Sequence, residues 1–169
     1  MKRLFNISAT KRNKTQEIIN TLTKNDYNGF KRSLLSYNEG KSRKLTSFFI
    51  DALEEGVYPR SIKLEIIQFL AKNGDSKCIP ILKSIISKNT DRWMARYSLL
   101  AIGNIDFSNN ESYIAEFLNN PDTWLRRYAI ILIKKYSTNQ NYLNILKSKE
   151  DIEPDEWNKY LVQNVNIEV

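Results

Sequence analysis

Three short motifs contain the residues of this sequence that are best suited to chemistry, because each places an aspartate two residues before a tryptophan. The motifs are Asp91-x-Trp93, Asp122-x-Trp124 and Asp155-x-Trp157. The chain has no histidine and a single cysteine, so a Ser–His or Cys–His nucleophile is unavailable and any catalysis would depend on carboxylates, lysine or tyrosine. The recurring Asp–Trp pair is therefore either an active-site signature or a structural element of a repeat.

The aspartates fall at a regular interval, which favours the repeat. Going back from Asp91 by similar steps reaches Arg60 and then Asp26, so five anchor positions are separated by 34, 31, 31 and 33 residues. Seven residues after each anchor the residue is small or apolar: Ser33, Ile67, Ser98, Ala129 and Val162. A period of this length is typical of a solenoid. A packing element recurs with every repeat, whereas a catalytic residue is needed once.

Apolar spacing predicts two helices in each repeat. First helices are expected at 15–22, 44–53, 78–86, 111–118 and 141–147, and second helices at 29–37, 60–72, 91–104, 122–136 and 155–164. Asp91, Asp122 and Asp155 stand at the start of a second helix, where a carboxylate accepts hydrogen bonds from free backbone N–H groups. Glycine and proline are scarce, at five and four residues, which favours long helices joined by short turns.

Two second-helix segments resemble the HEAT-repeat family, in particular its bacterial members, whose second helix reads D-x-W-x-V-R followed by a small residue. The matching residues are Asp91, Trp93, Arg96 and Ser98 in one segment and Asp122, Trp124, Arg127 and Ala129 in the other, with Pro80 in the preceding first helix. Ala95 and Arg126 replace the usual valine, and Arg60 and Ile62 replace aspartate and tryptophan in the second repeat. The resemblance implies an α-solenoid whose second helices line a concave surface, and it implies no particular activity.

We therefore expect an all-α fold, a right-handed α-solenoid of about five two-helix HEAT-like repeats forming a single domain over residues 1–169. Residues 1–40 would be a degenerate N-terminal capping repeat, 41–137 the central repeats and 138–169 a C-terminal capping repeat. In this arrangement the indoles of Trp93, Trp124 and Trp157 are expected to cover the seams between repeats, each burying about 200 Å². The alternative is partial exposure of these rings as anchors for a partner.

Basic residues cluster in the same second helices and admit two interpretations. In the first, Arg96 pairs locally with Asp91 and Arg127 with Asp122, and the lysines are solvated. In the second, the cations form a strip along the concave face that receives an anionic partner. The candidate residues of this cationic strip are Lys63, Arg92, Arg96, Arg126, Arg127, Lys134, Lys135 and Lys159.

An acidic segment, 150–156, precedes the last predicted helix. Its residues Glu150, Asp151 and Glu153 either stabilise the N-terminus of that helix or present an acidic knob to a basic partner. The opposite charge gathers at the start of the chain, where the first fourteen residues include no acid and five cations: Lys2, Arg3, Lys11, Arg12 and Lys14. Such an arm is typical of a mobile terminus or of a nucleic-acid contact.

The composition narrows the classes of function. The formal net charge of +7 favours anionic partners. The longest apolar run, 128–133, is far shorter than the roughly twenty residues of a membrane span, and no signal peptide is evident, so we expect a cytoplasmic protein that does not bind membranes.

Cys78 is the first residue of an apolar helix face and is expected in the core. No phosphate-binding glycine loop, EF-hand or paired-cysteine zinc motif is present, so neither a cofactor nor a metal is expected.

These observations favour a non-enzymatic helical-repeat protein that binds another protein through its second-helix surface. By analogy, a compact bacterial HEAT-like chain without catalytic groups can be an immunity protein that neutralises a cognate toxin. The alternative is nucleic-acid binding by the cationic strip, including a relative of the helical-repeat DNA alkylpurine glycosylases, which use an aspartate and tryptophans on a basic concave face. The Asp–Trp pairs recur here at the repeat junctions, which favours the non-catalytic interpretation.

Overall fold

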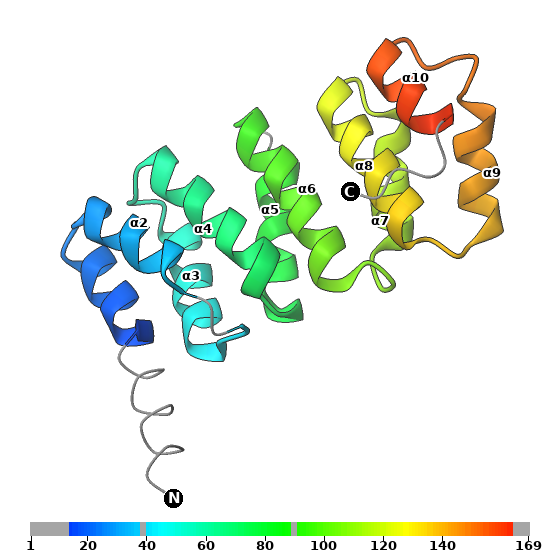
Figure 1. Cartoon of the computed structure of the whole chain (residues 1–169). Helices are drawn as coiled ribbons and strands as arrows, with labels where there is room; N and C mark the ends of the chain where they lie inside the picture. The colour runs from blue at the N-terminus through cyan, green and yellow to red at the C-terminus, as the bar shows by residue number, and fades with distance from the viewer. Residues whose placement is uncertain (1–13, 38–39, 89–90, 164–169) are drawn as a thin grey trace, which may run out of the picture. The chain divides into compact units, whose positions relative to one another are not determined.

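The structure is a computed structural model that describes residues 14–37, 40–88 and 91–163 (Figure 1). Over these residues the secondary structure is helical, without a strand, and the predicted all-α class is confirmed. None of the described helices is long and apolar enough to cross a membrane. The cations Lys2, Arg3, Lys11 and Arg12 lie outside the described residues. Contacts group the chain into an N-terminal unit, Met1–Ile81, and a C-terminal unit, Leu82–Val169.

The N-terminal unit consists of antiparallel helix pairs (Figure 1). A first helix, described over residues 14–23, is followed by α2 (Tyr27–Leu35), α3 (Arg43–Glu55), α4 (Arg60–Asn73) and the 3₁₀ turn η1 (Ser76–Cys78). The core contains three phenylalanines, in which the ring of Phe49 contacts those of Phe30 and Phe69 edge-on, at centroid distances of 6.1 and 5.3 Å. Phe30 and Phe49 are fully buried, so aromatic packing holds α2, α3 and α4 together.

Helix α5 (Ile79–Lys88) contains the boundary between the units. The C-terminal unit continues with α6 (Arg92–Asp106), α7 (Glu111–Glu116), the 3₁₀ turn η2 (Phe117–Asn119), α8 (Thr123–Tyr136), α9 (Gln140–Ser148) and α10 (Glu156–Gln163). Helix α8 is its centre, because it packs against α6, α7, η2, α9 and α10. A Cβ atom at Gly103 would lie 2.4 Å from Leu132 Cδ2, so a glycine is needed where α6 and α8 approach each other.

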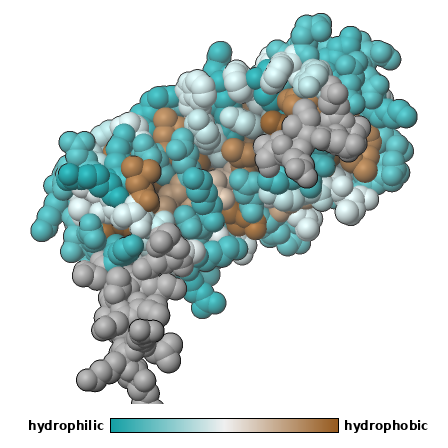
Figure 2. Space-filling model, viewed as in Figure 1, coloured by the Kyte–Doolittle hydropathy of each residue, from teal (hydrophilic) through white to brown (hydrophobic). Residues whose placement is uncertain are grey.

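Helices occur at all the predicted places, with ends that differ by one or two residues. Helix α2 begins two residues before its predicted start because Asp26 caps it, with Asp26 Oδ1 accepting a hydrogen bond of 2.9 Å from the Gly29 N–H. Cys78 is fully buried, as predicted. On the face drawn in Figure 2, hydrophilic side chains predominate and hydrophobic ones form small separate patches.

Candidate functional site

Each tryptophan of the C-terminal unit is positioned by an aspartate that caps its helix. Asp91 Oδ1 accepts hydrogen bonds of 2.9 and 3.0 Å from the N–H groups of Trp93 and Met94. Asp122 Oδ1 accepts hydrogen bonds of the same lengths from the N–H groups of Trp124 and Leu125. The predicted capping role of these carboxylates is confirmed, and it fixes an indole in the first turn of both α6 and α8.

Asp155 plays the same part at the last helix. Its Oδ1 atom accepts a hydrogen bond of 2.9 Å from the Asn158 N–H, and its carbonyl accepts one of 2.9 Å from the Lys159 N–H. Trp157 therefore also lies in the first turn of a capped helix.

The arginines join neighbouring second helices. Arg96 of α6 donates two hydrogen bonds to the carboxylate of Asp122, from Nη2 at 2.7 Å and from Nε at 3.2 Å. Arg127 of α8 repeats the arrangement, with Nη2 3.1 Å from Asp155 Oδ1 and Nε donating to Asn158 Oδ1 at 2.9 Å. A guanidinium thus reaches the aspartate that begins the next second helix in the chain.

The predicted local pairs, Arg96 with Asp91 and Arg127 with Asp122, are therefore wrong. An N-cap carboxylate points toward the N–H groups of its own first turn, and a residue five positions later lies about 140° away around the helix. Arg96 consequently projects toward α8 instead of back toward its own cap. The sequence analysis correctly predicted that these arginines pair with aspartates. It placed each pair within one repeat, whereas the structure places it between two successive second helices.

The two aspartates in these pairs are held in the charged form. Burial alone would raise the pKa of Asp122, but the hydrogen bonds from Arg96 and from the N–H groups of Leu125 and Trp124 lower it below its ordinary value of 3.8. The Asn158 N–H and the Arg127 guanidinium lower the pKa of Asp155 in the same way. Both carboxylates have their hydrogen-bonding capacity largely occupied by the chain itself.

Two of the indoles, those of Trp93 and Trp124, lie over arginines, and all three indoles remain exposed. The guanidinium carbon of Arg96 is 5.3 Å from the ring centroid of Trp93 and 5.7 Å from that of Trp124, and the guanidinium carbon of Arg127 is 4.2 Å from the Trp124 ring. The exposed fractions of Trp93, Trp124 and Trp157 are 44%, 38% and 57%. The prediction that these rings are buried in the repeat seams is wrong, although Trp93 and Trp124 do touch, with centroids 6.4 Å apart.

Helical geometry explains this exposure. The buried face of α6 carries Ala95, Leu99 and Ile102. Trp93 precedes Ala95 by two residues and is therefore about 200° away around the helix. The apolar core thus occupies the other side of α6 and leaves the indole at the surface.

Each indole is paired with a tyrosine of its own helix. Tyr97 and Trp93 stack at 6.2 Å, Tyr128 lies 6.4 Å from Trp124, and Tyr160 and Trp157 stack at 5.4 Å. We call this set the aromatic row: Trp93, Tyr97, Trp124, Tyr128, Trp157 and Tyr160. Burial and the charge of Tyr97 raise the pKa of Tyr128. The sequence interpretation missed the tyrosines, although the spacing W-x-x-x-Y in two repeats and W-x-x-Y in the third was visible.

A buried polar network fastens α10 to the start of α8. Arg126 donates to the Glu153 carboxylate from Nη2 at 2.8 Å and from Nε at 3.1 Å, and both residues are buried, at 8% and 6% exposed. Asn158 is fully buried and donates to the Thr123 carbonyl at 3.1 Å and to Glu153 at 3.3 Å. Burial opposes the charge on Glu153, but the hydrogen bonds from Arg126, Asp155 N–H and Asn158 lower its pKa below the ordinary 4.5.

The acidic segment is therefore only partly available to a partner. Glu153 is occupied by Arg126, so its assignment to an acidic knob is wrong. Asp151 is exposed and Glu150 is half-buried. The buried carboxylate of Glu153 forms an internal ion pair with Arg126. The sequence of acidic residues alone could not distinguish this role from that of a surface charge.

The predicted cationic strip is not one surface of free charges. Arg96, Arg126 and Arg127 are paired within the C-terminal unit, and Lys134 donates a hydrogen bond to the Leu161 carbonyl. Lys63 belongs to α4 of the N-terminal unit and donates to the Gly56 carbonyl at 3.0 Å. The other predicted strip residues are Arg92 and Lys135, which are exposed, and Lys159, which is half-buried.

Comparison with known proteins identifies no relative of this chain. No protein-family model, no curated protein and no solved structure matches this chain. Among the residues that the structure describes, no group of three or more Cys, Asp and Glu side chains is placed to hold a metal ion. What the chain does must therefore be inferred from its own residues, and the aromatic row is the most distinctive surface it offers.

Proposed function

We propose that this protein binds another protein and that the aromatic row is the contact surface. The observation that carries the proposal is the exposure of three indoles, at 38–57%, on helices that are fixed to one another by internal ion pairs. Tryptophan and tyrosine dominate the energetics of protein interfaces because they bury a large area while ordering few bonds. Helices that are already rigid lose little further entropy on association.

The charge of the C-terminal unit supports a protein partner for this surface over a nucleic acid. Residues 82–169 contain eleven lysines and arginines and eleven aspartates and glutamates, so the unit has no formal net charge. The guanidinium groups beneath the aromatic row are already paired with aspartates. Affinity for nucleic acid comes chiefly from cations that are free to neutralise phosphates, and this surface offers few.

The state of the aspartates supports a non-enzymatic role for the same surface. Asp122 and Asp155 serve as helix caps and as arginine partners, and their pKa values are lowered. A general base works best when its pKa lies near the working pH and when it can reach the substrate. A glycosylase-like use of these carboxylates would require breaking the links between α6, α8 and α10.

For the whole chain we propose a right-handed α-solenoid of about five HEAT-like repeats. Two features support it: the regular succession of helix pairs, and the repetition in α6, α8 and α10 of a capping aspartate followed by an exposed tryptophan. The second helices would then present the aromatic row on a common face. Neutralisation of a toxin by an immunity protein is the narrower form of this proposal, since a rigid preformed surface suits tight inhibition.

The test is affinity capture by the full chain, followed by a binding measurement with the purified captured protein. We expect Trp157→Ala to weaken binding by roughly thirtyfold, corresponding to a hot-spot loss of about 2 kcal/mol. Trp157 is the best first choice because it is the most exposed of the three indoles and stacks on Tyr160 instead of lying over an arginine. Trp93→Ala and Trp124→Ala should weaken binding as well.

The matched control is Ile152→Ala, which removes an apolar side chain that is 69% exposed in the same unit and lies outside the aromatic row. Binding by this variant should stay within twofold of the unaltered protein. Equal losses in both variants, or capture that disappears after nuclease treatment, would contradict the proposal. Rescue of growth by co-expression with a captured toxic protein tests the narrower immunity proposal separately.

A further inference from the structure

We propose that the N-terminal unit binds the sugar–phosphate backbone of a nucleic-acid duplex through cations gathered at one end of its helices. We call this surface the basic end and define it by six side chains: Lys14, Lys41, Arg43, Lys44, Lys72 and Lys77. It shares no residue with the aromatic row and fits a different class of partner. It is therefore independent of the proposed protein-binding function.

Four helix ends converge to form this surface. Lys14 Nζ, at the start of the first helix, donates a hydrogen bond of 3.0 Å to the Ser36 carbonyl at the end of α2. Lys44 Nζ, at the start of α3, donates a hydrogen bond of 2.8 Å to Gln16 Oε1.

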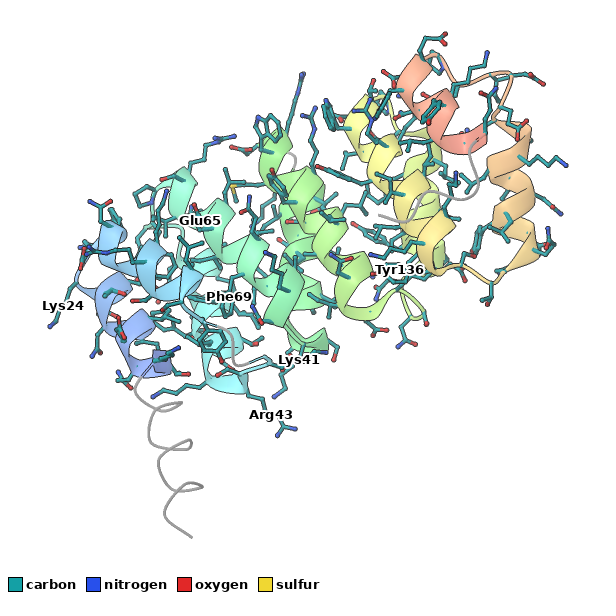
Figure 3. The ribbon with its side chains drawn as sticks, viewed as in Figure 1. Lys24, Lys41, Arg43, Glu65, Phe69 and Tyr136 are labelled. Carbon is teal, nitrogen blue, oxygen red and sulfur yellow. The ribbon has the colours of Figure 1, made fainter. Side chains whose placement is uncertain are left out.

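Two further contacts complete the basic end. The ring of Tyr37 lies 5.3 Å from that of Phe69 in the last turns of α4, and η1 packs against α3. In Figure 3, Lys41 and Arg43 project outward beside the start of α3, whereas Lys24 lies at the opposite end of the first helix.

The net charge of the protein is concentrated in this unit. Residues 1–81 contain fifteen lysines and arginines and eight aspartates and glutamates, which gives +7, the charge of the whole chain. Several acids of the unit lie in the last turns of α3 or at the start of α2, away from the basic end: Asp26, Asp51, Glu54 and Glu55. The cations of the basic end therefore lie apart from these four acids.

The cations of the basic end are not consumed by the fold. Within the described part of the chain, none of the six forms an ion pair with a carboxylate. Two described acids of the unit, Glu17 and Asp75, have other partners, because Glu17 accepts a hydrogen bond from Ser33 Oγ at 2.8 Å and Asp75 caps η1 through the Lys77 N–H at 3.0 Å. Arg96, Arg126 and Arg127 of the C-terminal unit, by contrast, are paired inside it.

Helix stability does not account for the cations either. Ser42 caps α3, and Arg43 and Lys44 are the first two residues of that helix, whose first turn contains no acid. Positive charge at a helix N-terminus opposes the helix dipole. These residues are therefore unfavourable for α3 in the free protein and become favourable when an anion is present.

The composition of the surface favours a duplex backbone over other polyanions. Proteins that bind single strands stack the bases on aromatic side chains, and all three tryptophans lie in the C-terminal unit. A membrane interface requires an apolar face to insert, whereas among the described residues near this end the exposed large apolar side chain is Leu35 alone. Long, flexible cations without apolar anchors match phosphate contacts, which are independent of sequence.

The test uses the full chain and a fluorescein-labelled DNA duplex of about 20 base pairs, long enough to span the basic end at roughly 3.4 Å per base pair. Binding is followed by anisotropy at several salt concentrations. The test variant is Lys41→Gln/Arg43→Gln/Lys44→Gln. The control variant is Lys24→Gln/Lys88→Gln/Lys147→Gln, which removes the same number of exposed charges elsewhere.

Counterion release predicts a slope of log affinity against log salt of about −0.9 for each phosphate neutralised. We expect the test variant to reduce the magnitude of this slope by about 2 to 3 and to weaken binding at least roughly tenfold at low salt. The control variant should keep the slope of the unaltered protein. Trp157→Ala should bind the duplex normally, which separates this inference from the proposed protein-binding function.

Three results would overturn the inference: no duplex binding by the unaltered chain at low salt, equal slope changes in the test and control variants, or tighter binding to phosphatidylserine vesicles than to the duplex. Circular dichroism verifies that each variant is folded. If the triple substitution unfolds the unit, the single variant Arg43→Gln still tests the proposal. Its slope should fall in magnitude by about 0.9, and an unchanged slope would count against the proposal.

Discussion

The two units of this protein use charge in opposite ways. The N-terminal unit carries the whole net charge of +7 and the C-terminal unit carries none. In the N-terminal unit, the ion pair Lys31–Glu65 spans 3.3 Å between side chains that are 43% and 37% exposed. In the C-terminal unit three arginine–carboxylate pairs join α6, α8 and α10, with arginine side chains only 10–13% exposed.

The cores differ correspondingly. Edge-on phenylalanine rings hold the N-terminal helices together, whereas the C-terminal unit combines an aliphatic core with the buried Arg126–Glu153–Asn158 network. Charges used for internal cohesion are not available to a partner, and charges left at a helix end are. The two surfaces therefore differ in how their cations are paired. The cations beneath the aromatic row are bound to carboxylates of the same unit, whereas those of the basic end are not.

The largest expected effect comes from breaking a buried pair of the C-terminal unit. Glu153→Gln leaves Arg126 buried with its charge uncompensated, and we expect a loss of about 3 kcal/mol in the free energy of unfolding. The exposed pair gives the contrast, because Glu65→Gln should change the same quantity by about 0.5 kcal/mol or less. Urea unfolding followed by tryptophan fluorescence measures the first effect selectively, since all three tryptophans lie in residues 82–169.

Far-UV circular dichroism measures both variants over the whole chain. If Glu65→Gln proved as costly as Glu153→Gln, the distinction between internal and surface charge would fail. A double-mutant cycle with Arg126→Met sharpens the result, because the coupling energy isolates the pair from the loss of either side chain alone.

Acid should loosen the C-terminal unit through the same carboxylates. Folding lowers the pKa of Glu153 from 4.5 and those of Asp122 and Asp155 from 3.8. The stabilisation they contribute is therefore complete above about pH 5 and is lost progressively as the pH falls through the lowered values. Tryptophan fluorescence recorded between pH 6 and pH 2.5 should report this loss, with part of the change absent in Glu153→Gln. An identical acid transition in the unaltered protein and in Glu153→Gln would show that Glu153 does not contribute to it.

The sequence predicted the elements well and their surroundings less well. Periodicity located the helices, and the aspartates at 91 and 122 were assigned correctly as caps, because both features depend on neighbours in the chain. The partners of Arg96 and Arg127 lie 26 and 28 residues away, so local spacing gave the wrong pairs. The exposure of the indoles depends on which face of α6 and α8 the core occupies, and a repeated Trp is compatible with either face.

Glu153 illustrates the same limit from the other side. In a run of acidic residues, the sequence alone does not identify the one carboxylate that is buried and paired with Arg126. The charge difference between the units, by contrast, was present in the sequence and required only the position of the boundary.

The smallest expected effect compares one repeat position in the two units. Ser33 and Ser98 both lie seven residues after an anchor, and both are buried, at 4% and 0% exposed. Ser33 Oγ donates a hydrogen bond of 2.8 Å to Glu17 Oε1, whereas Ser98 Oγ has no partner among the described residues. Ser33→Ala should therefore cost about 1 kcal/mol, and Ser98→Ala should leave the free energy of unfolding unchanged or raise it by up to about 1 kcal/mol, because an unpaired buried hydroxyl is removed. Urea midpoints at constant m-value measure both, and a loss at Ser98 as large as that at Ser33 would show that its hydroxyl has a partner, such as a bound water.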